Sequence, residues 1–320
     1  MRKSIMVLMV SVLLAAVPTL AGPLLKKQVS SRADWLVHTD HEQFKKTRIG
    51  RLIRQELADI GIEEQLSNFA MIFSFHPLDD VRNVTIYGTG QDRKKAVVLI
   101  DGFFDKEKIL SLLRMNPQYK EIKYGDIALY EWFDENQKDP NGTAGQMMYG
   151  CFYQDDLIVM GVGQEGVKHA VDVLKGSAAN AENVIFSQAA QEAKGAFFQA
   201  MALNVAEIVG KQQEAAALRQ TDQAGLAIGE INGKFYIDLG LKTKSLDAGQ
   251  AVTKMLEGII AFAVLAGEEQ PSMLAELAKK VKVTCENKTV QVRFESDPES
   301  VVQFLKEQWQ KKKEQDSKAQ

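Results

Sequence analysis

Residues 224–241, AGLAIGEINGKFYIDLGL, decide the fold class. They form two strand-like runs, 224–231 and 234–241, separated by Asn232 and Gly233. An Asn-Gly dipeptide between two such runs is the strongest short-range signal for a β-hairpin, because both residues tolerate a positive φ. A similar pattern over 281–294 predicts another hairpin. Since hairpins join neighbouring antiparallel strands, we expect largely antiparallel sheets.

The order of strands and helices repeats along the chain. Residues 33–176 and residues 196–310 each show a strand, a helix, a hairpin, a helix, a hairpin and a helix. We therefore predict an α+β fold with two similar units, helices on one face of each sheet, and an internal duplication. Residues 22–32 are predicted to be a linker, residues 177–195 a connecting segment, and residues 311–320 a disordered polar tail.

The N-terminus has the pattern of a secretory signal peptide. Arg2 and Lys3 precede an uncharged stretch, and a small residue, Ala21, stands just before Gly22. We predict that residues 1–21 are removed by cleavage between Ala21 and Gly22, so that the mature chain is exported to the periplasm or the exterior. The apolar stretch is shorter than the roughly 20 residues that cross a bilayer. No transmembrane span is expected in the mature chain.

Composition limits the classes of partner. The 320 residues include 39 Lys and Arg against 42 Asp and Glu, so the formal net charge of -3 provides no basic field for a nucleic acid backbone. Cys151 and Cys285 are the only cysteines. In an oxidising compartment they either pair or remain as buried thiols, and the sequence leaves both possibilities open.

Four stretches carry a resemblance to a known group of proteins. They are ADWLVHTD at 33–40, TRIG at 47–50, VTIYG at 84–88 and VVLIDG at 97–102. Together they resemble uncharacterised exported bacterial proteins built from duplicated α+β units. The resemblance spans most of the mature chain and implies the same fold class. That group has no established activity, so the resemblance assigns no site residues.

The densest group of chemically active side chains lies at residues 38–42, His-Thr-Asp-His-Glu. His38, Asp40 and His41 are therefore the candidate metal ligands. A zincin motif needs a second His four residues after the first, where this chain has Lys45. Because the run passes from a strand end into a helix start, we predict that Asp40 is an N-cap that accepts a backbone N–H. His76 and His169 stand apart from other candidate ligands in the sequence, and we expect each to be an isolated structural or exposed histidine.

Three further motifs fail as cofactor or metal sites. Gly161, Gly163 and Gly166 have dinucleotide-binding spacing, but the run before them is expected to be the second arm of a hairpin and not a parallel strand. Residues 229–235 have one residue too few for a phosphate loop, and residues 134–139 have Lys138 where a calcium loop needs an oxygen ligand. We predict a tight turn, a hairpin and a solvated loop, with no cofactor and no catalytic residue.

These observations favour an exported, non-catalytic protein that acts in binding or in envelope organisation, with an envelope component or a protein as partner. One alternative is a hydrolase-type enzyme with a dispersed site. Another is a periplasmic carrier of an apolar ligand, to which the apolar segment 256–266 points. Since eleven residues cannot span a bilayer, we expect this segment to be a helix buried between a sheet and a partner.

Overall fold

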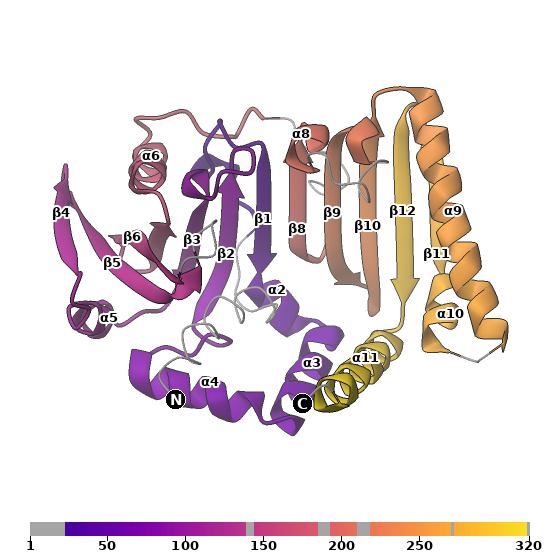
Figure 1. Cartoon of the computed structure of the whole chain (residues 1–320), viewed down its shortest axis with the longest axis horizontal. Coiled ribbons are helices and arrows are strands. Elements are labelled where there is room, and N and C mark those ends of the chain that lie inside the picture. The colour runs from indigo at the N-terminus through magenta and orange to yellow at the C-terminus, as the bar shows by residue number, and fades with distance from the viewer. Residues whose placement is uncertain (1–22, 139–143, 185–192, 210–217, 270–271, 319–320) are drawn as a thin grey trace. The chain divides into compact units, whose positions relative to one another are not determined.

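The computed structural model describes residues 23–138, 144–184, 193–209, 218–269 and 272–318. The predicted cleavage site, Ala21 and Gly22, lies outside these residues. The chain divides into two compact units: unit 1 comprises residues 1–45 and 58–185, and unit 2 comprises residues 46–57 and 186–320. Both are α+β (Figure 1), so the predicted fold class is confirmed. The junction at residues 185 and 186 falls inside the predicted connecting segment.

The strands of unit 1 are β1 (Trp35–Asp40), β2 (Val81–Gly88), β3 (Val97–Gly102), β4 (Lys120–Tyr124), β5 (Ile127–Lys138), β6 (Ala144–Gln154) and β7 (Leu157–Gly161). Its helices are α2 (His41–Lys46), α4 (Ile62–Phe73), α5 (Lys106–Leu113) and α6 (Gln164–Leu174), with short 3-10 turns η1 (Lys26–Gln28) and η2 (Arg93–Lys95). The sheet order is β1-β2-β3-β7-β6-β5-β4, and each neighbouring pair is antiparallel.

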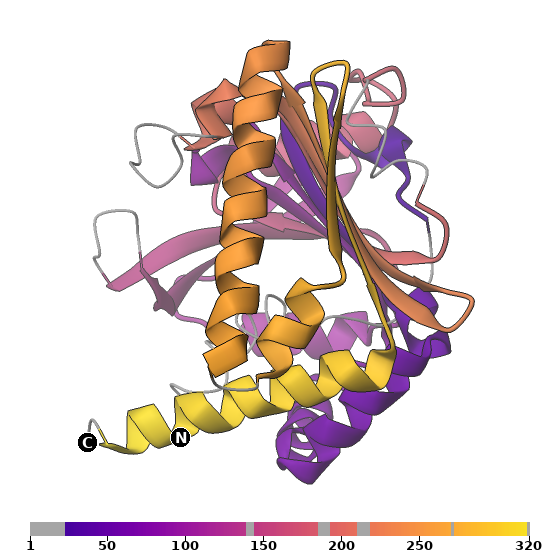
Figure 2. The same cartoon turned by 90° about the vertical axis from the view of Figure 1, so that its right-hand side faces the viewer.

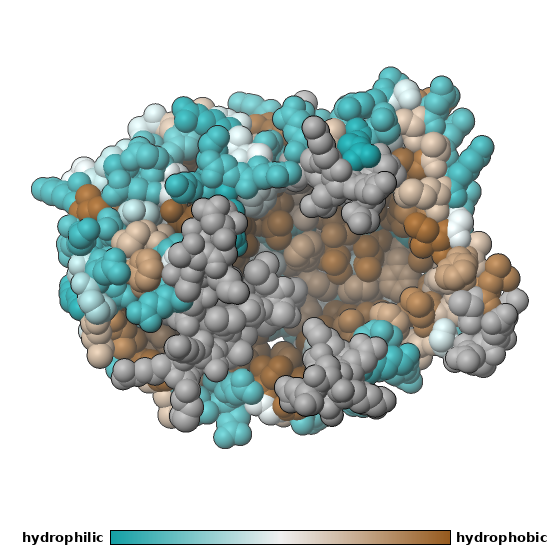
Figure 3. Space-filling model, in the orientation of Figure 1, coloured by the Kyte–Doolittle hydropathy of each residue, from teal (hydrophilic) through white to brown (hydrophobic). Residues whose placement is uncertain are grey.

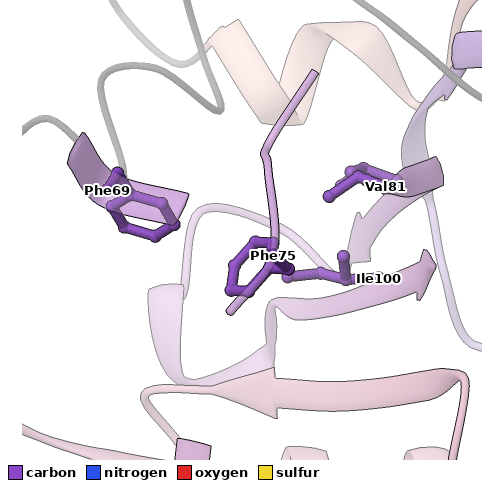
Figure 4. Packing of buried hydrophobic residues seen from close by; sticks show 5 residues of the cluster. Phe69, Phe75, Val81 and Ile100 are labelled. Atoms are coloured by element: carbon purple, nitrogen blue, oxygen red, sulfur yellow. The ribbon is translucent and has the colours of Figure 1, made fainter. Parts of the chain in front are cut away.

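Helices cover both faces of the unit 1 sheet, whereas the sequence predicted one face. On β3, Val98 and Ile100 pack toward the core cluster of α4 (Figure 4). The alternate residue Val97 lies on the other face, beside Gly166 of α6. The reason is that β3 is apolar at four successive positions, so both of its faces require cover.

The predicted linker at 22–32 is part of unit 1 where the structure describes it. Val29 is fully buried, and Ser30 forms a β-bridge with Asn180. The Ser30 hydroxyl is also hydrogen-bonded to His169 Nε2 at 2.9 Å. His169 is therefore a structural histidine, as predicted, and this segment packs against the unit because Val29 is one of its core residues.

The strands of unit 2 are β8 (Ala196–Leu203), β9 (Thr221–Ile231), β10 (Lys234–Thr243), β11 (Val281–Glu286) and β12 (Thr289–Ser296). Its helices are α3 (Arg48–Asp59), α8 (Val205–Val209), α9 (Leu246–Glu269), α10 (Met273–Ala278) and α11 (Pro298–Lys318), with a 3-10 turn η4 (Leu218–Gln220). The sheet order is β8-β9-β10-β12-β11, with antiparallel neighbours.

The predicted hairpin at 224–241 joins β9 to β10. Asn232 and Gly233 have φ values of 52° and 74°, as a two-residue hairpin turn requires. Figure 2 shows α9 lying in front of the sheet, with α10 and α11 at its end. The predicted disordered tail is wrong for 311–318, which continue α11. Its Lys, Glu and Gln residues are good helix formers, and no Gly or Pro interrupts them.

Residues 46–57 belong to unit 2, although the sequence predicted them in unit 1. The Glu230 carboxylate, near the end of β9, accepts the backbone N–H groups of Arg48 and Ile49 at 2.9 Å each. It therefore caps the start of α3. At the other end of α3, Lys306 of α11 donates to Glu56 at 2.9 Å. These contacts join segments about 180 and 250 residues apart, which no local pattern reveals.

The two units share their strand connections. The order β1-β2-β3-β7-β6 in unit 1 corresponds to β8-β9-β10-β12-β11 in unit 2. Each begins with a strand and a helical segment, continues with a hairpin and a second helical segment, and ends with a hairpin and a helix. The repeat of element order predicted from the sequence is therefore present. Unit 1 differs by the additional hairpin of β4 and β5.

Candidate functional site

The predicted candidates His38, Asp40 and His41 serve the structure of unit 1. His38 is 2% exposed, and its Nδ1 lies 2.8 Å from the Thr85 hydroxyl of β2. Asp40 accepts the backbone N–H of Gln43 at 2.9 Å, which confirms the predicted N-cap of α2. His41 is buried as well. Within the described residues these three side chains do not form a metal-ligating group.

The glycine-rich turn is closed by the protein's own backbone. β7 pairs antiparallel with β3 and β6, which excludes the parallel strand of a dinucleotide fold. A Cβ at Gly163 would lie 2.0 Å from the Lys94 carbonyl oxygen, and one at Gly161 would lie 2.8 Å from that of Ala96. The glycines are required by this close backbone approach, as predicted for a tight strand-to-helix turn.

Two other expectations have different outcomes. Asp134, predicted in a solvated loop, is buried in β5, and part of that predicted loop, residue 139, lies outside the described residues. Cys151 and Cys285 are both free thiols. Burial raises the pKa of Cys151 to about 12, so the thiol is held in its unreactive neutral form.

The most unusual surface feature is on α9. Met255, Ile259, Phe262 and Leu265 follow one another at intervals of three or four residues, which places them on one side of the helix. They are 44%, 59%, 74% and 59% exposed. We name these four residues the α9 apolar surface. Figure 3 shows apolar side chains along this helix and on the adjoining sheet face of unit 2.

The opposite side of α9 makes the contact with the sheet. Val252 is buried against Leu241 and Val290, and Leu256 packs at the edge of the same cluster. From residue 258 to residue 265 the sequence contains no polar side chain at all. A helix that is apolar on all sides is normally buried on all sides. The sheet covers one side of α9, and the cover of its other side by a partner stays a prediction.

α9 is also a candidate for a membrane span, by length and composition only. Leu246–Leu265 spans 20 residues with a mean hydropathy of 1.4, and 11% of that apolar window is buried in the protein. Among the described residues, α9 is the one helix whose length and composition would allow it to cross a bilayer. The α9 apolar surface consists of two aliphatic side chains, one thioether and one phenyl ring, and covering these side chains leaves no strongly polar group unpaired.

Sequence reasoning also missed one cluster of ionisable groups. His76, expected to be isolated, lies 3.2 Å from Asp79 and 3.9 Å from Glu63. Glu63 is on α4, a helix that the sequence analysis did not identify. The signal that could have found it is the apolar spacing of Leu66, Phe69 and Phe73.

Comparison with known proteins gives fold-level similarity alone. No protein-family model matches the chain, and no curated protein matches it. Among solved structures, the chain is similar to TP0453 in crystal form III, with a TM-score of 0.45, 8% identity, and coverage of 89% of this chain and 98% of that one. For crystal form IV of TP0453 the TM-score is 0.42 at 10% identity, covering 89% and 97%.

Proposed function

We propose that this chain is an exported, non-catalytic protein that attaches to the surface of a lipid bilayer through the α9 apolar surface. The observation that carries the proposal is the exposure of Ile259, Phe262 and Leu265 on a helical stretch without polar side chains. The expected signal peptide places the chain in the cell envelope, where bilayers are at hand.

The lack of hydrogen-bonding groups favours lipid over a protein partner. Protein interfaces are enriched in aromatic residues, Met and Arg, but they also typically form about one hydrogen bond per 100–200 Å². Residues 258–265 contain only Gly, Ala, Ile, Phe, Val and Leu, and so offer no side-chain hydrogen bond. Because no charge stands among these residues, we expect attachment to neutral lipid that does not weaken as salt is added.

The test is flotation of the mature chain, residues 22–320, with phosphatidylcholine vesicles. The triple variant Ile259→Ser, Phe262→Ser, Leu265→Ser removes side chains that are 59%, 74% and 59% exposed. Transfer of these exposed portions into hydrocarbon contributes about 3 to 6 kcal/mol, so the variant should lose at least about a hundredfold in partitioning. The matched control is Met71→Ser, Phe103→Ser, Met115→Ser in unit 1, where the exposures are 72%, 59% and 73%.

The control should float like the unsubstituted chain. If the unsubstituted chain stays with the soluble fraction, the proposal is wrong. It is also wrong if the triple α9 variant still floats, or if that variant changes the oligomeric state and leaves flotation untouched. The last result would show that a second copy of the chain covers α9.

Carriage of an apolar ligand is a second candidate, favoured by the sheet face beside α9. Leu239 of β10 is opposite Leu226 on one neighbouring strand and Val292 on the other, and all three are half-buried. Figure 3 shows a hollow over these strands with apolar residues at its floor. This candidate predicts uptake of a fluorescent fatty acid that persists in the triple α9 variant and is lost in Leu239→Glu.

A further inference from the structure

A second chemical feature, independent of the α9 apolar surface, lies in unit 1. Glu63, His76 and Asp79 each offer one ligand atom, and these atoms all lie within 4.8 Å of one another. Among the described residues, this is the one group of His, Cys, Asp or Glu side chains whose ligand atoms lie close enough together to hold a single metal ion. All three side chains are partly exposed.

The fold brings the three residues together by reversing the chain after α4. Ser74 has a left-handed φ of 56°, and its backbone N–H donates the last hydrogen bond of the helix to the Ala70 carbonyl at 2.8 Å. The chain then returns along α4, so that the Phe75 ring meets the Phe69 ring edge to face at 5.2 Å. Figure 4 shows Phe69 and Phe75 with Val81 and Ile100 in the same cluster. This core fixes the segments that carry Glu63 and His76.

The backbone of His76 is fixed as well. Its N–H donates to the Asp80 carboxylate at 2.6 Å. Asp80 therefore orients the loop between α4 and β2 without using the imidazole. Both ring nitrogens of His76 remain directed at the carboxylates of the cluster, with Nδ1 3.2 Å from Asp79 and Nε2 3.9 Å from Glu63.

An ion pair alone does not account for the geometry at Nδ1. This nitrogen is buried and forms no hydrogen bond, although Asp79 Oδ2 is only 3.2 Å away. Two atoms that face each other at this distance outside hydrogen-bonding geometry are placed like two ligands of one ion. In a tetrahedral zinc site with bonds of 2.0–2.2 Å, neighbouring ligand atoms are about 3.3–3.6 Å apart.

We propose that Glu63, His76 and Asp79 form a zinc site. The imidazole and two carboxylates are ligands that Zn²⁺ accepts, and the two carboxylate charges balance the dication. Three protein ligands leave one tetrahedral position for water. The bound ion ties the first turn of α4 to the segment that precedes β2. One ion takes one ring nitrogen, so binding at Nδ1 requires the Glu63 carboxylate, which now lies 3.9 Å from Nε2, to swing toward Nδ1. The three ligand atoms start within 4.8 Å of one another, so this movement is short.

The experiment measures thermal unfolding of the mature chain with and without added ZnCl₂. Zinc should raise the melting temperature of the unsubstituted chain, because a ligand that binds only the folded state stabilises it by mass action. The variants Glu63→Gln, His76→Gln and Asp79→Asn keep side-chain size but remove a ligand. Each should weaken zinc binding by more than the 10- to 100-fold that loss of an outer-shell partner causes.

The matched control is His169→Gln, which removes another partly buried histidine of the same unit. It should retain the full response to zinc. Melting without zinc shows whether each variant folds, and the visible absorption of bound Co²⁺ reports tetrahedral ligation directly. No zinc response in the unsubstituted chain would overturn the site, as would a response that survives His76→Gln. Vesicle flotation does not depend on this outcome.

Discussion

Removal of the Glu230 carboxylate tests whether α3 is held by unit 2. In the structure this carboxylate accepts the backbone N–H groups of Arg48 and Ile49, both at 2.9 Å. The first N–H groups of a helix have no partner within the helix, and a negative charge at this end also interacts favourably with the helix dipole. We expect Glu230→Ala to destabilise unit 2 and to release the start of α3.

The magnitude follows from the burial of the two amides. Ile49 is 1% exposed, so its N–H finds little water when the carboxylate is lost, and a hydrogen bond to a charged group contributes about 1.5–3 kcal/mol. The Arg48 amide is exposed and rebinds water, so its loss adds a few tenths of a kcal/mol. With the dipole contribution, we expect a loss of about 2–4 kcal/mol. Glu230→Gln keeps one acceptor oxygen and should lose about half as much.

The assay is urea unfolding combined with hydrogen exchange of the α3 amides. Glu230→Ala should lower the unfolding free energy of unit 2 and speed exchange at the start of α3, while the amides of β2 and β3 keep their protection. Glu286→Ala, at an exposed acid at the end of β11, is the control. A loss below about 0.5 kcal/mol, equal to that of the control, would refute the assignment of α3 to unit 2.

Three further predictions concern unit 1. Asp40→Ala should cost about 0.5–2 kcal/mol of stability, whereas Asp40→Asn, which keeps the acceptor for the Gln43 amide, should cost little; urea unfolding measures both. Burial raises the pKa of Cys151 to about 12, so its thiol should be unreactive in the folded chain. In the Cys285→Ser variant, where Cys151 is the remaining thiol, a disulfide reagent should react only on unfolding. Rapid reaction with the folded variant would contradict this. Burial, with a contribution from Arg32, lowers the pKa of His169, so the unfolded chain takes up a proton that the folded chain does not. Stability should therefore fall as the pH drops below about 6.5, and His169→Gln should remove that part of the pH dependence of unfolding.

The sequence predicts the features of this fold that depend on neighbouring residues. The Asn232-Gly233 turn, the Asp40 cap and the glycine turn at 161–166 each rest on contacts or dihedral angles that the residue types themselves demand. The repeated order of strands and helices could be predicted for the same reason, because period and turn residues are local signals. The antiparallel sheets then follow from the hairpins.

The missed features depend on contacts between distant parts of the chain. Nothing near Ile49 shows that Glu230 caps its helix, and nothing near His76 shows that Glu63 lies 3.9 Å away. The exposure of Phe262 was missed for a related reason. An apolar helix predicts an apolar neighbour, but its sequence does not say whether the same chain supplies one.

The correspondence between the units explains why α9 is exposed. The helix after the second hairpin strand is α5 in unit 1, where Leu110 packs on Tyr130 and Trp132 of β5 as well as on β6. In unit 2 the equivalent segment is α9, but β11 ends the sheet where β5 would follow. Among the described residues of unit 2, no strand extends the apolar floor beyond β11, while the helix is longer, at 24 residues against 8. The proposed attachment to lipid would supply cover for Phe262, since residues 258–265 carry no polar side chain that hydrocarbon would leave unpaired.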